Sequence, residues 1–200
     1  MKPRHDGAVP IIGGGIGGLT LALSLHRAGI ACRIYESAAE FMPLGVGINI
    51  LPHATAELRT LGVLEQLEGV AVVTREAAFF NRFGQLVYCE PAGRWAGYDV
   101  PQLSIHRADL HGVLLAEVRR RLGDDCVLNG HACGGVEDLG DDGVRASFRD
   151  PDGADRGEAR GAIAVACDGI HSVVRRQLYP NEGPPRWSGV NMWRGVAPHA

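Results

Sequence analysis

A cluster of glycines near the start of the chain constrains the fold more than any other feature of the sequence. Residues 11–20 read IIGGGIGGLT, with the spacing Gly13-x-Gly15-x-x-Gly18 after an apolar run. In a strand-to-helix turn, the first glycine of this spacing permits the bend, the second admits a pyrophosphate, and the third lets helix and strand pack closely. The string alone is a weak signal, because glycine-rich turns also occur for packing reasons.

The residues around the turn strengthen this interpretation. An apolar run at 8–12 predicts a buried strand, the apolar spacing at 16–29 predicts a helix, and ACRIYE at 31–36 predicts a second strand that ends in an acid. That acid, Glu36, can accept from both ribose hydroxyls of an adenosine and would repel a 2′-phosphate; the alternative is a solvated strand-end acid. Pro10 departs from the pattern, because proline avoids central strands. The sequence predicts a β-α-β unit that binds an ADP moiety through Gly13, Gly15, Ile16, Gly17, Gly18 and Glu36.

Composition limits the partners and the compartment that we expect. Apolar residues make up 46% and charged residues 22% of the 200 residues, as is typical of globular proteins. The formal net charge of -3 gives no reason to expect binding to nucleic acid or to an anionic membrane. The five widely spaced cysteines include no C-x-x-C pair, which indicates free thiols in a reducing compartment. No window reaches the roughly 18 apolar residues of a membrane helix. We therefore expect a cytoplasmic protein.

The rest of the chain alternates strand and helix patterns. The expected elements are a loop at 41–52, a helix at 52–61, a hairpin of 70–80 with 85–89, a strand and helix from 101, an antiparallel meander over 126–166, a strand at 162–167 followed by a helix, and a strand over 190–196. This order predicts an α/β fold, a Rossmann-like domain with a β-meander and the start of a second, substrate-binding sheet.

A second motif lies far downstream of the glycine turn. The apolar run at 162–167 is followed by Asp168-Gly169 and then by Ser172 and Arg175, in the string CDGIHSVVR. Together the two motifs resemble the single-component FAD-dependent aromatic hydroxylases, flavoprotein monooxygenases in which a motif of this shape serves both FAD and NAD(P)H. Three further stretches resemble the same family, closest to its phenazine-carboxylate and salicylate hydroxylase type: PLGVGINILP (43–52), SIHRADL (104–110) and WSGVNMWRGV (187–196).

The resemblance implies a cofactor, co-substrates and further site residues. FAD would be reduced by NAD(P)H and react with dioxygen to a C4a-hydroperoxide, which hydroxylates a small aromatic substrate. Gly47 would lie in a loop that reaches the flavin, Arg107 would contact the pyrophosphate and ribityl region, and Asp168 would belong to the second motif. We also expect the backbone of Cys133, at the start of a meander strand, to face the adenine. No side chain here is assigned a catalytic role.

The resemblance also implies a domain organisation. Residues 1–180 would form the FAD-binding domain and residues 181–200 would begin a substrate domain. The family's G-D motif does not follow Asp168 in this sequence. We therefore expect the chain to be the N-terminal half of such an enzyme, inactive alone.

Two other functions stay open at this point. One is an FAD-dependent dehydrogenase or oxidase with the same fold and no hydroxylation, and the other is a non-catalytic nucleotide-binding module. A metal site is not expected, because His106 and His111 lack acidic or cysteine partners at ligand spacing. The identity of the aromatic substrate, the choice between NADH and NADPH, and the oligomeric state are left open by the sequence.

Overall fold

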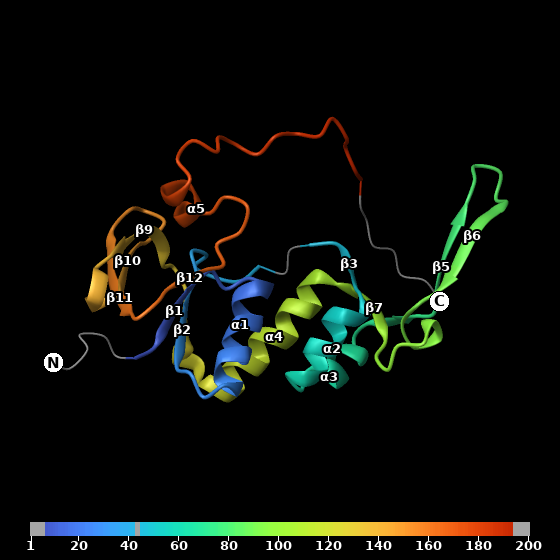
Figure 1. Ribbon diagram of the computed structural model, residues 1–200, viewed down its shortest axis with the longest axis horizontal. Coiled ribbons are helices and arrows are strands. Elements are labelled where there is room, and N and C mark those ends of the chain that lie inside the picture. The colour runs from blue at the N-terminus through green and yellow to red at the C-terminus, as the bar shows by residue number, and fades with distance from the viewer. Residues whose placement is uncertain (1–6, 43–44, 194–200) are drawn as a thin grey trace. The chain divides into compact units, whose positions relative to one another are not determined.

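The fold is described from a computed structural model, which covers residues 7–42 and 45–193 (Figure 1). The described residues divide between two compact units. The first lies within Met1–Met42 and Leu114–Asn191, and the second within Pro43–Val113 and Met192–Ala200. Helix α4 (Arg107–Leu122) contributes to both units, so that each unit is described by itself below.

A parallel sheet forms the centre of the first unit. Its strands, in the order β12-β1-β2-β8, are β12 (Val165–Ala166), β1 (Val9–Ile12), β2 (Cys32–Tyr35) and β8 (Val127–Leu128). All four residues of β1 are buried, as expected for a strand covered on both faces. Helix α1 (Ile16–Arg27) buries Leu19 and Leu23, and Gly29 follows it in a left-handed conformation. The expected β-α-β unit is confirmed.

Pro10 fits inside β1 because of the register of its neighbours. The amide of Val9 donates to Ala31 on the β2 side (2.8 Å), so the nitrogen of the next residue faces the β12 side. There β12 pairs only with Ile11 and Ile12, and the proline needs no ladder bond. A Cβ built on Gly161 would lie 2.6 Å from the Pro10 ring, so a glycine makes room for it.

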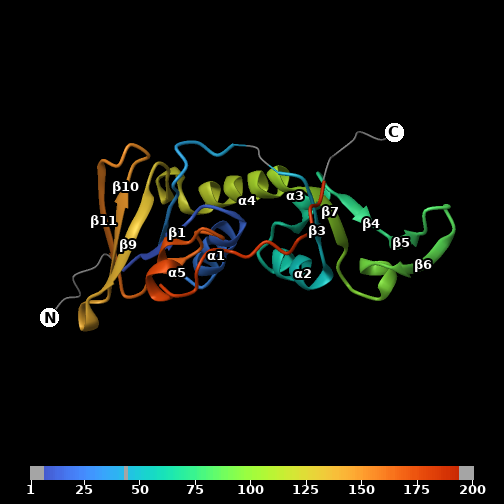
Figure 2. The same cartoon turned by 90° about the horizontal axis from the view of Figure 1, so that it is seen from above.

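The antiparallel meander is also confirmed, with two differences at its ends. Strands β9 (Ala132–Asp138), β10 (Val144–Arg149) and β11 (Asp155–Gly161) pair in the order β11-β10-β9 and run side by side in Figure 2. Residues 127–128, expected in the meander, instead pair with β2. The strand expected at 162–167 is wrong except at 165–166, because pairing with β1 begins only after Pro10. Helix α5 (Val173–Leu178) follows.

The second unit contains a three-stranded antiparallel sheet with two helices. Its order is β3-β7-β4, from β3 (Gly47–Ile50), β7 (Gln102–His106) and β4 (Val72–Thr74). The loop expected at 41–52 is wrong at 47–50, where Ile48 and Ile50 pair with β7 despite the glycines and prolines around them. The helix expected at 52–61 is α2 (Pro52–Thr60), and α3 (Leu64–Glu68) follows it.

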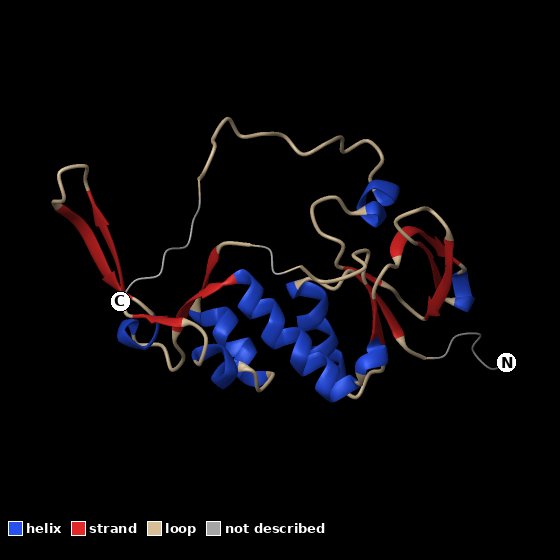
Figure 3. Cartoon of the chain, turned by 180° about the vertical axis from the view of Figure 1, so that it is seen from behind, coloured by secondary structure: helices blue, strands red, loops and turns tan. Residues whose placement is uncertain are grey.

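The hairpin expected from 70–80 with 85–89 is wrong at 72–74, which pair with β7, and its remainder forms a sheet of its own. Strands β5 (Glu76–Phe80) and β6 (Leu86–Pro91) pair antiparallel, separate from the other strands of this unit (Figure 3). The strand expected over 190–196 is wrong at 190–193, which form no strand, and its remainder lies outside the described residues. Short 3-10 helices occur at η1 (Gly93–Ala96), η2 (Asp124–Cys126) and η3 (Gly140–Asp142).

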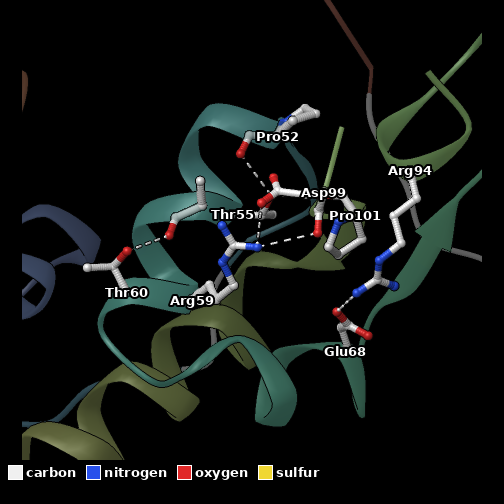
Figure 4. Close-up of polar contacts among 9 residues, drawn as sticks. Pro52, Thr55, Arg59, Thr60, Glu68, Arg94, Asp99 and Pro101 are labelled. Atoms are coloured by element: carbon white, nitrogen blue, oxygen red, sulfur yellow. Dashed lines mark hydrogen bonds and ion pairs between the residues drawn. The ribbon is translucent and has the colours of Figure 1, made fainter. Parts of the chain in front are cut away.

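Polar contacts hold the segment after β6 against α2 and α3 (Figure 4). The buried hydroxyl of Thr55 donates to the carbonyl of Pro101 (2.7 Å). Arg59 forms an ion pair with Asp99 (2.9 Å). A further ion pair, of 2.9 Å, joins Arg94 in η1 to Glu68 at the end of α3. These bonds position the residues that precede β7.

Candidate nucleotide-binding site

The three spaced glycines of the turn differ in what surrounds them. Gly13 has a φ of +103°, and a Cβ there would lie 2.4 Å from the carbonyl oxygen of Cys167. At Gly18 a Cβ would lie 2.0 Å from the carbonyl oxygen of Gly13. At Gly15, by contrast, no described atom lies within 4 Å of an added Cβ. Two glycines therefore let backbone meet backbone, and Gly15 faces open space.

The N-terminus of α1 begins directly at this open space. Gly15 is the N-cap and offers no side chain to the first amides of the helix. The first-turn amides, which include those of Ile16 and Gly17, have no acceptor within a helix, and they mark the positive end of its dipole. No acidic residue occupies this first turn. The turn can therefore bind an anion through backbone amides.

Glu36 follows β2 and bonds back to the glycine turn. Its Oε2 accepts from the amide of Gly14 (2.7 Å), and its Oε1 accepts from the amide of Ala38 (2.8 Å) and the hydroxyl of Ser37 (2.9 Å). An ionised carboxylate offers about four acceptor positions. Three are taken by the protein, so that one position, on Oε2, is left for a ligand. The sequence indicated a ligand-binding acid and missed this internal bonding.

The start of β9 is tied to the residues after β2. The amide of His131 donates to the carbonyl of Glu36 (2.7 Å), and that of Gly130 donates to the carbonyl of Ala38 (3.0 Å). Cys133 follows as the second residue of β9. Burial raises the pKa of its thiol, and also that of Cys167, so both thiols are held in the neutral form. The pocket wall at this end is formed by backbone and uncharged side chains.

The second motif builds the start of α5. Asp168 Oδ2 accepts from the amide of Val173 (2.8 Å), and Ser172 Oγ accepts from the amide of Arg175 (2.9 Å). The Arg175 guanidinium donates to the carbonyl of Ile170 (2.6 Å) and forms an ion pair with Glu182 (2.9 Å). The polar residues of this motif therefore bond to the chain itself.

These segments enclose one pocket of about 370 Å³ in the first unit. Five residues expected in the site line it together: Gly13, Gly15, Glu36, Cys133 and Asp168. Tyr35, His131 and His171 also line the pocket and were not predicted, although Tyr35 lies in ACRIYE and His171 in CDGIHSVVR. Gly18 lies beneath the turn, against the carbonyl of Gly13, as a packing residue.

Of the other four candidate residues, Ile16 and Gly17 begin α1 and are not among the residues that line this pocket, and Gly47 and Arg107 lie in the second unit. Gly47 pairs with His106, and the amide of Arg107 donates to the carbonyl of Val46 (3.1 Å). A Cβ on Gly45 would lie 2.9 Å from the Cβ of Arg107. The structure thus brings Arg107 beside the glycine-rich loop that carries Gly47.

The described residues, 7–42 and 45–193, contain neither a metal-binding cluster nor a membrane-spanning helix. No group of three or more His, Cys, Asp or Glu side chains in these ranges is arranged to hold a metal ion. In the same part of the chain, no helix has the length and apolar character needed to cross a membrane. All five cysteines are free thiols.

Comparisons with known proteins agree with this geometry. A family model described as FAD binding domain matches residues 6–192. Phenazine 1,6-dicarboxylic acid hydroxylase PhzS of Lysobacter antibioticus is 40% identical over 94% of this chain and 46% of its own length. The 3-amino-4-hydroxybenzoate 2-monooxygenase PtmB3 of Streptomyces platensis is 37% identical over 98% of the chain and 46% of its own length. The chain spans about half the length of the curated relatives it matches.

Solved structures show the same likeness. The p-nitrophenol 4-monooxygenase PnpA from Pseudomonas putida DLL-E4 is 26% identical, with a TM-score of 0.74 over 86% of this chain and 43% of that one. A variant of HpxO from Klebsiella pneumoniae, complexed with FAD, is 28% identical, with a TM-score of 0.69 over 85% of this chain and 42% of that one.

Proposed function

The chain belongs to the FAD binding domain family, and from that premise we propose that it forms the FAD-binding part of a monooxygenase that hydroxylates a small aromatic substrate with NAD(P)H and dioxygen. The observation that carries the proposal is the pocket in which the glycine turn, Glu36 and Asp168 meet. Two relatives that match this chain are named as a phenazine 1,6-dicarboxylic acid hydroxylase and a 3-amino-4-hydroxybenzoate 2-monooxygenase. Those names favour oxygenation over a dehydrogenase, an oxidase or a non-catalytic module.

The pocket fits the ADP end of FAD. Gly15 leaves open space in front of the first-turn amides, and a Cβ would fill that space. The amides of Ile16 and Gly17 would bind the pyrophosphate, while Gly13 and Gly18 shape the turn. The free acceptor position on Glu36 Oε2 would take one ribose hydroxyl, rather than the two that the sequence suggested. Asp168 would act mainly by holding α5 at the pocket edge.

Arg107 and Gly47 are assigned to the rest of the cofactor on the sequence resemblance. Arg107 presents a planar, permanently charged guanidinium at the start of α4, beside the loop that carries Gly47. We assign it to the pyrophosphate and ribityl region, with Gly47 in the loop that approaches the flavin. When bound, FAD supplies the electron transfer and oxygen chemistry, and the protein supplies binding and orientation.

The proposal also includes the domain boundaries and the cellular compartment of the protein. We retain residues 1–180 as the FAD-binding domain and residues 181–200 as the beginning of a substrate domain. We place the protein in the cytoplasm, because widely spaced free cysteines suit a reducing compartment.

FAD binding is tested by titrating FAD into the chain and following flavin fluorescence. Gly15→Val should weaken binding by about tenfold or more, because the added side chain enters the ligand's space and touches no described protein atom. Far-UV circular dichroism should stay unchanged. Gly112→Val is the matched control, since Gly112 also has no described atom within 4 Å of its Cβ position but lies within α4. Equal FAD affinity in both variants would reject the assignment of the turn.

The reaction class is tested on the protein that carries this chain. It is given FAD, NAD(P)H, isotopically labelled dioxygen and a panel of hydroxylated or carboxylated aromatic compounds. A monooxygenase should place one labelled oxygen atom in the product. A dehydrogenase or oxidase would consume the reductant, or form peroxide, and leave the aromatic unlabelled.

A further inference from the structure

His131 lines the pocket but has no role in the assignments above. It lies just before β9, and it shares the pocket wall with Glu36 and Cys133. Its amide bonds to the carbonyl of Glu36 (2.7 Å). The backbone of His131 is therefore joined directly to that of Glu36, the residue assigned to the ribose.

The ring of His131 is fixed by an aromatic cluster. It meets Tyr35 edge-on, with centroids 5.9 Å apart and an interplanar angle of 64°. It meets Phe148 in the same way, at 6.0 Å and 68°. Tyr35 and Phe148 are themselves stacked at 4.2 Å, and Phe148 is only 1% exposed. This packing limits the rotation of the imidazole.

A hydrogen bond also fixes which ring nitrogen carries the proton. His131 Nδ1 lies 2.7 Å from the carbonyl oxygen of Asn129. A carbonyl oxygen only accepts, so Nδ1 must donate. In the neutral ring, Nε2 is then an acceptor without a proton. His131, which lines the pocket together with Glu36, therefore carries a hydrogen-bond acceptor at Nε2.

The base of the nucleotide would lie at this end of the pocket. The glycine turn takes the pyrophosphate and Glu36 takes the ribose, so the wall formed by residues 131–133 is left for the base. Adenine carries an amino group at C6, which donates hydrogen bonds. Hypoxanthine carries a carbonyl there, which accepts them and would face the lone pair of Nε2.

We propose that His131 is a specificity residue that accepts a hydrogen bond from the 6-amino group of adenine through Nε2, and so selects adenine over hypoxanthine nucleotides. The inference rests on the proposed function, because it places a dinucleotide cofactor in this pocket. It adds a determinant of base identity that lies in a side chain outside both sequence motifs.

The test compares ADP with inosine diphosphate, in which a carbonyl replaces the 6-amino group and N1 carries a proton. Both are titrated into the chain by calorimetry at pH 8, above the ordinary titration range of imidazole. The unmodified chain should prefer ADP by about fivefold, the usual size of one hydrogen bond. His131→Phe keeps a ring in the cluster and removes Nε2, so its ADP affinity should fall to that for inosine diphosphate. His26→Phe, an exposed histidine near the end of α1, is the matched control and should keep the preference.

The outcomes separate the inference from the proposed function. If His131 served packing alone, its replacement would weaken both ligands equally and keep their ratio, which would overturn the inference. If the unmodified chain bound neither ligand, the proposed function would fail instead. A second measurement needs no variant: on addition of ADP, the ¹⁵N resonance of His131 Nε2 should shift as that atom accepts a hydrogen bond. Its failure to shift while ADP is bound would also overturn the inference.

Discussion

Two glycines, one from each unit, show two different uses of this residue. In the first unit, Gly18 has an ordinary helical conformation, yet its missing Cβ lets backbone meet backbone. In the second unit, Gly84 closes the β5–β6 turn with a φ of +77° and has no described atom within 4 Å of its Cβ position. Packing requires a glycine at position 18, and the backbone conformation requires one at position 84. Packing at Gly13 and Gly18 presses the turn against the sheet, and this leaves Gly15 at an open helix N-terminus.

Strand β1 of the first unit and strand β6 of the second unit differ in burial. Every residue of β1 is buried, whereas every residue of β6 is exposed. Phe80 is 60% exposed and Tyr88 is 53% exposed, so the hairpin depends on backbone pairing and on its turn. Asn81 Oδ1 supports that turn by accepting from the amides of Phe83 (2.9 Å) and Gln85 (3.1 Å). A small change should therefore cost more in the first unit than in the hairpin.

The largest effect is expected from alanine at these two glycines. Gly18→Ala places a Cβ 2.0 Å from a backbone oxygen and should lower the free energy of unfolding by about 3 kcal/mol or more. Gly84→Ala meets only the conformational cost of a positive φ, about 1–2 kcal/mol. Urea unfolding, followed by circular dichroism, measures both. Equal losses would show that the glycine turn is no more tightly packed than the hairpin turn.

The second prediction concerns Glu36, which serves both the fold and the proposed ligand. Glu36→Ala removes the bonds to the amides of Gly14 and Ala38, and charge-assisted bonds of this kind contribute about 1.5–3 kcal/mol. FAD affinity should fall by at least about tenfold, and the free energy of unfolding should fall as well. The two are measured by flavin titration and by urea unfolding. A variant with unchanged values for both would make Glu36 a solvated strand-end acid.

Part of this site was predictable from the sequence, because several of its residues belong to short motifs with a characteristic spacing. The glycine turn, the acid after β2 and the Asp168 motif each follow a strand, and strands of a parallel sheet end at one edge. The bonding of Glu36 within the protein was not predictable, since its Oε2 accepts from the amide of Gly14, which is far from it in the sequence. His131 was missed because its place depends on bonds to Glu36 and Asn129, and neither its spacing nor its neighbours mark it.

The same reasoning applies to the fold. Helices α1 and α2 were predictable because each has an apolar stripe and a glycine just past its end. Strand β3 was missed because its four residues lie among glycines and prolines and are specified by pairing with β7. The short β12 was predicted too long, because its length depends on where Pro10 lies in the neighbouring strand. Such long-range pairings leave little trace in local composition.

The third prediction concerns the contribution of Arg107 to cofactor binding. Arg107→Lys keeps the positive charge and loses the planar fork, so FAD should bind about three- to tenfold more weakly. Arg119→Lys, near the other end of α4, is the matched control and should leave FAD affinity unchanged. Flavin fluorescence titration measures both variants. If Arg107→Lys and Arg107→Ala bound FAD as well as the unmodified chain, Arg107 would be an ordinary helix-start residue, and the first unit alone would carry the binding.

The smallest expected effect lies in α4, the helix that both units share. The Glu117 carboxylate accepts hydrogen bonds from Arg120 (2.7 Å) and from Arg121. The bond from Arg120 has the largest effect, and together the two bonds lower the pKa of the Glu117 carboxyl from an ordinary 4.5 to about 2. Because the folded pKa is the lower one, the stabilisation is fully present above pH 4.5 and is lost as the pH falls toward 2.

Side-chain ion pairs along one helix are partly screened by water, so this contribution should be no more than about 1 kcal/mol. Urea unfolding of the unmodified chain should therefore show a loss of stability between pH 4.5 and pH 2 that is smaller in Glu117→Gln. Glu57→Gln, which replaces an exposed carboxylate of α2, controls for the loss of one acid and should keep the full slope. If Glu117→Gln kept that slope as well, the acid sensitivity of the chain would have to come from other carboxylates.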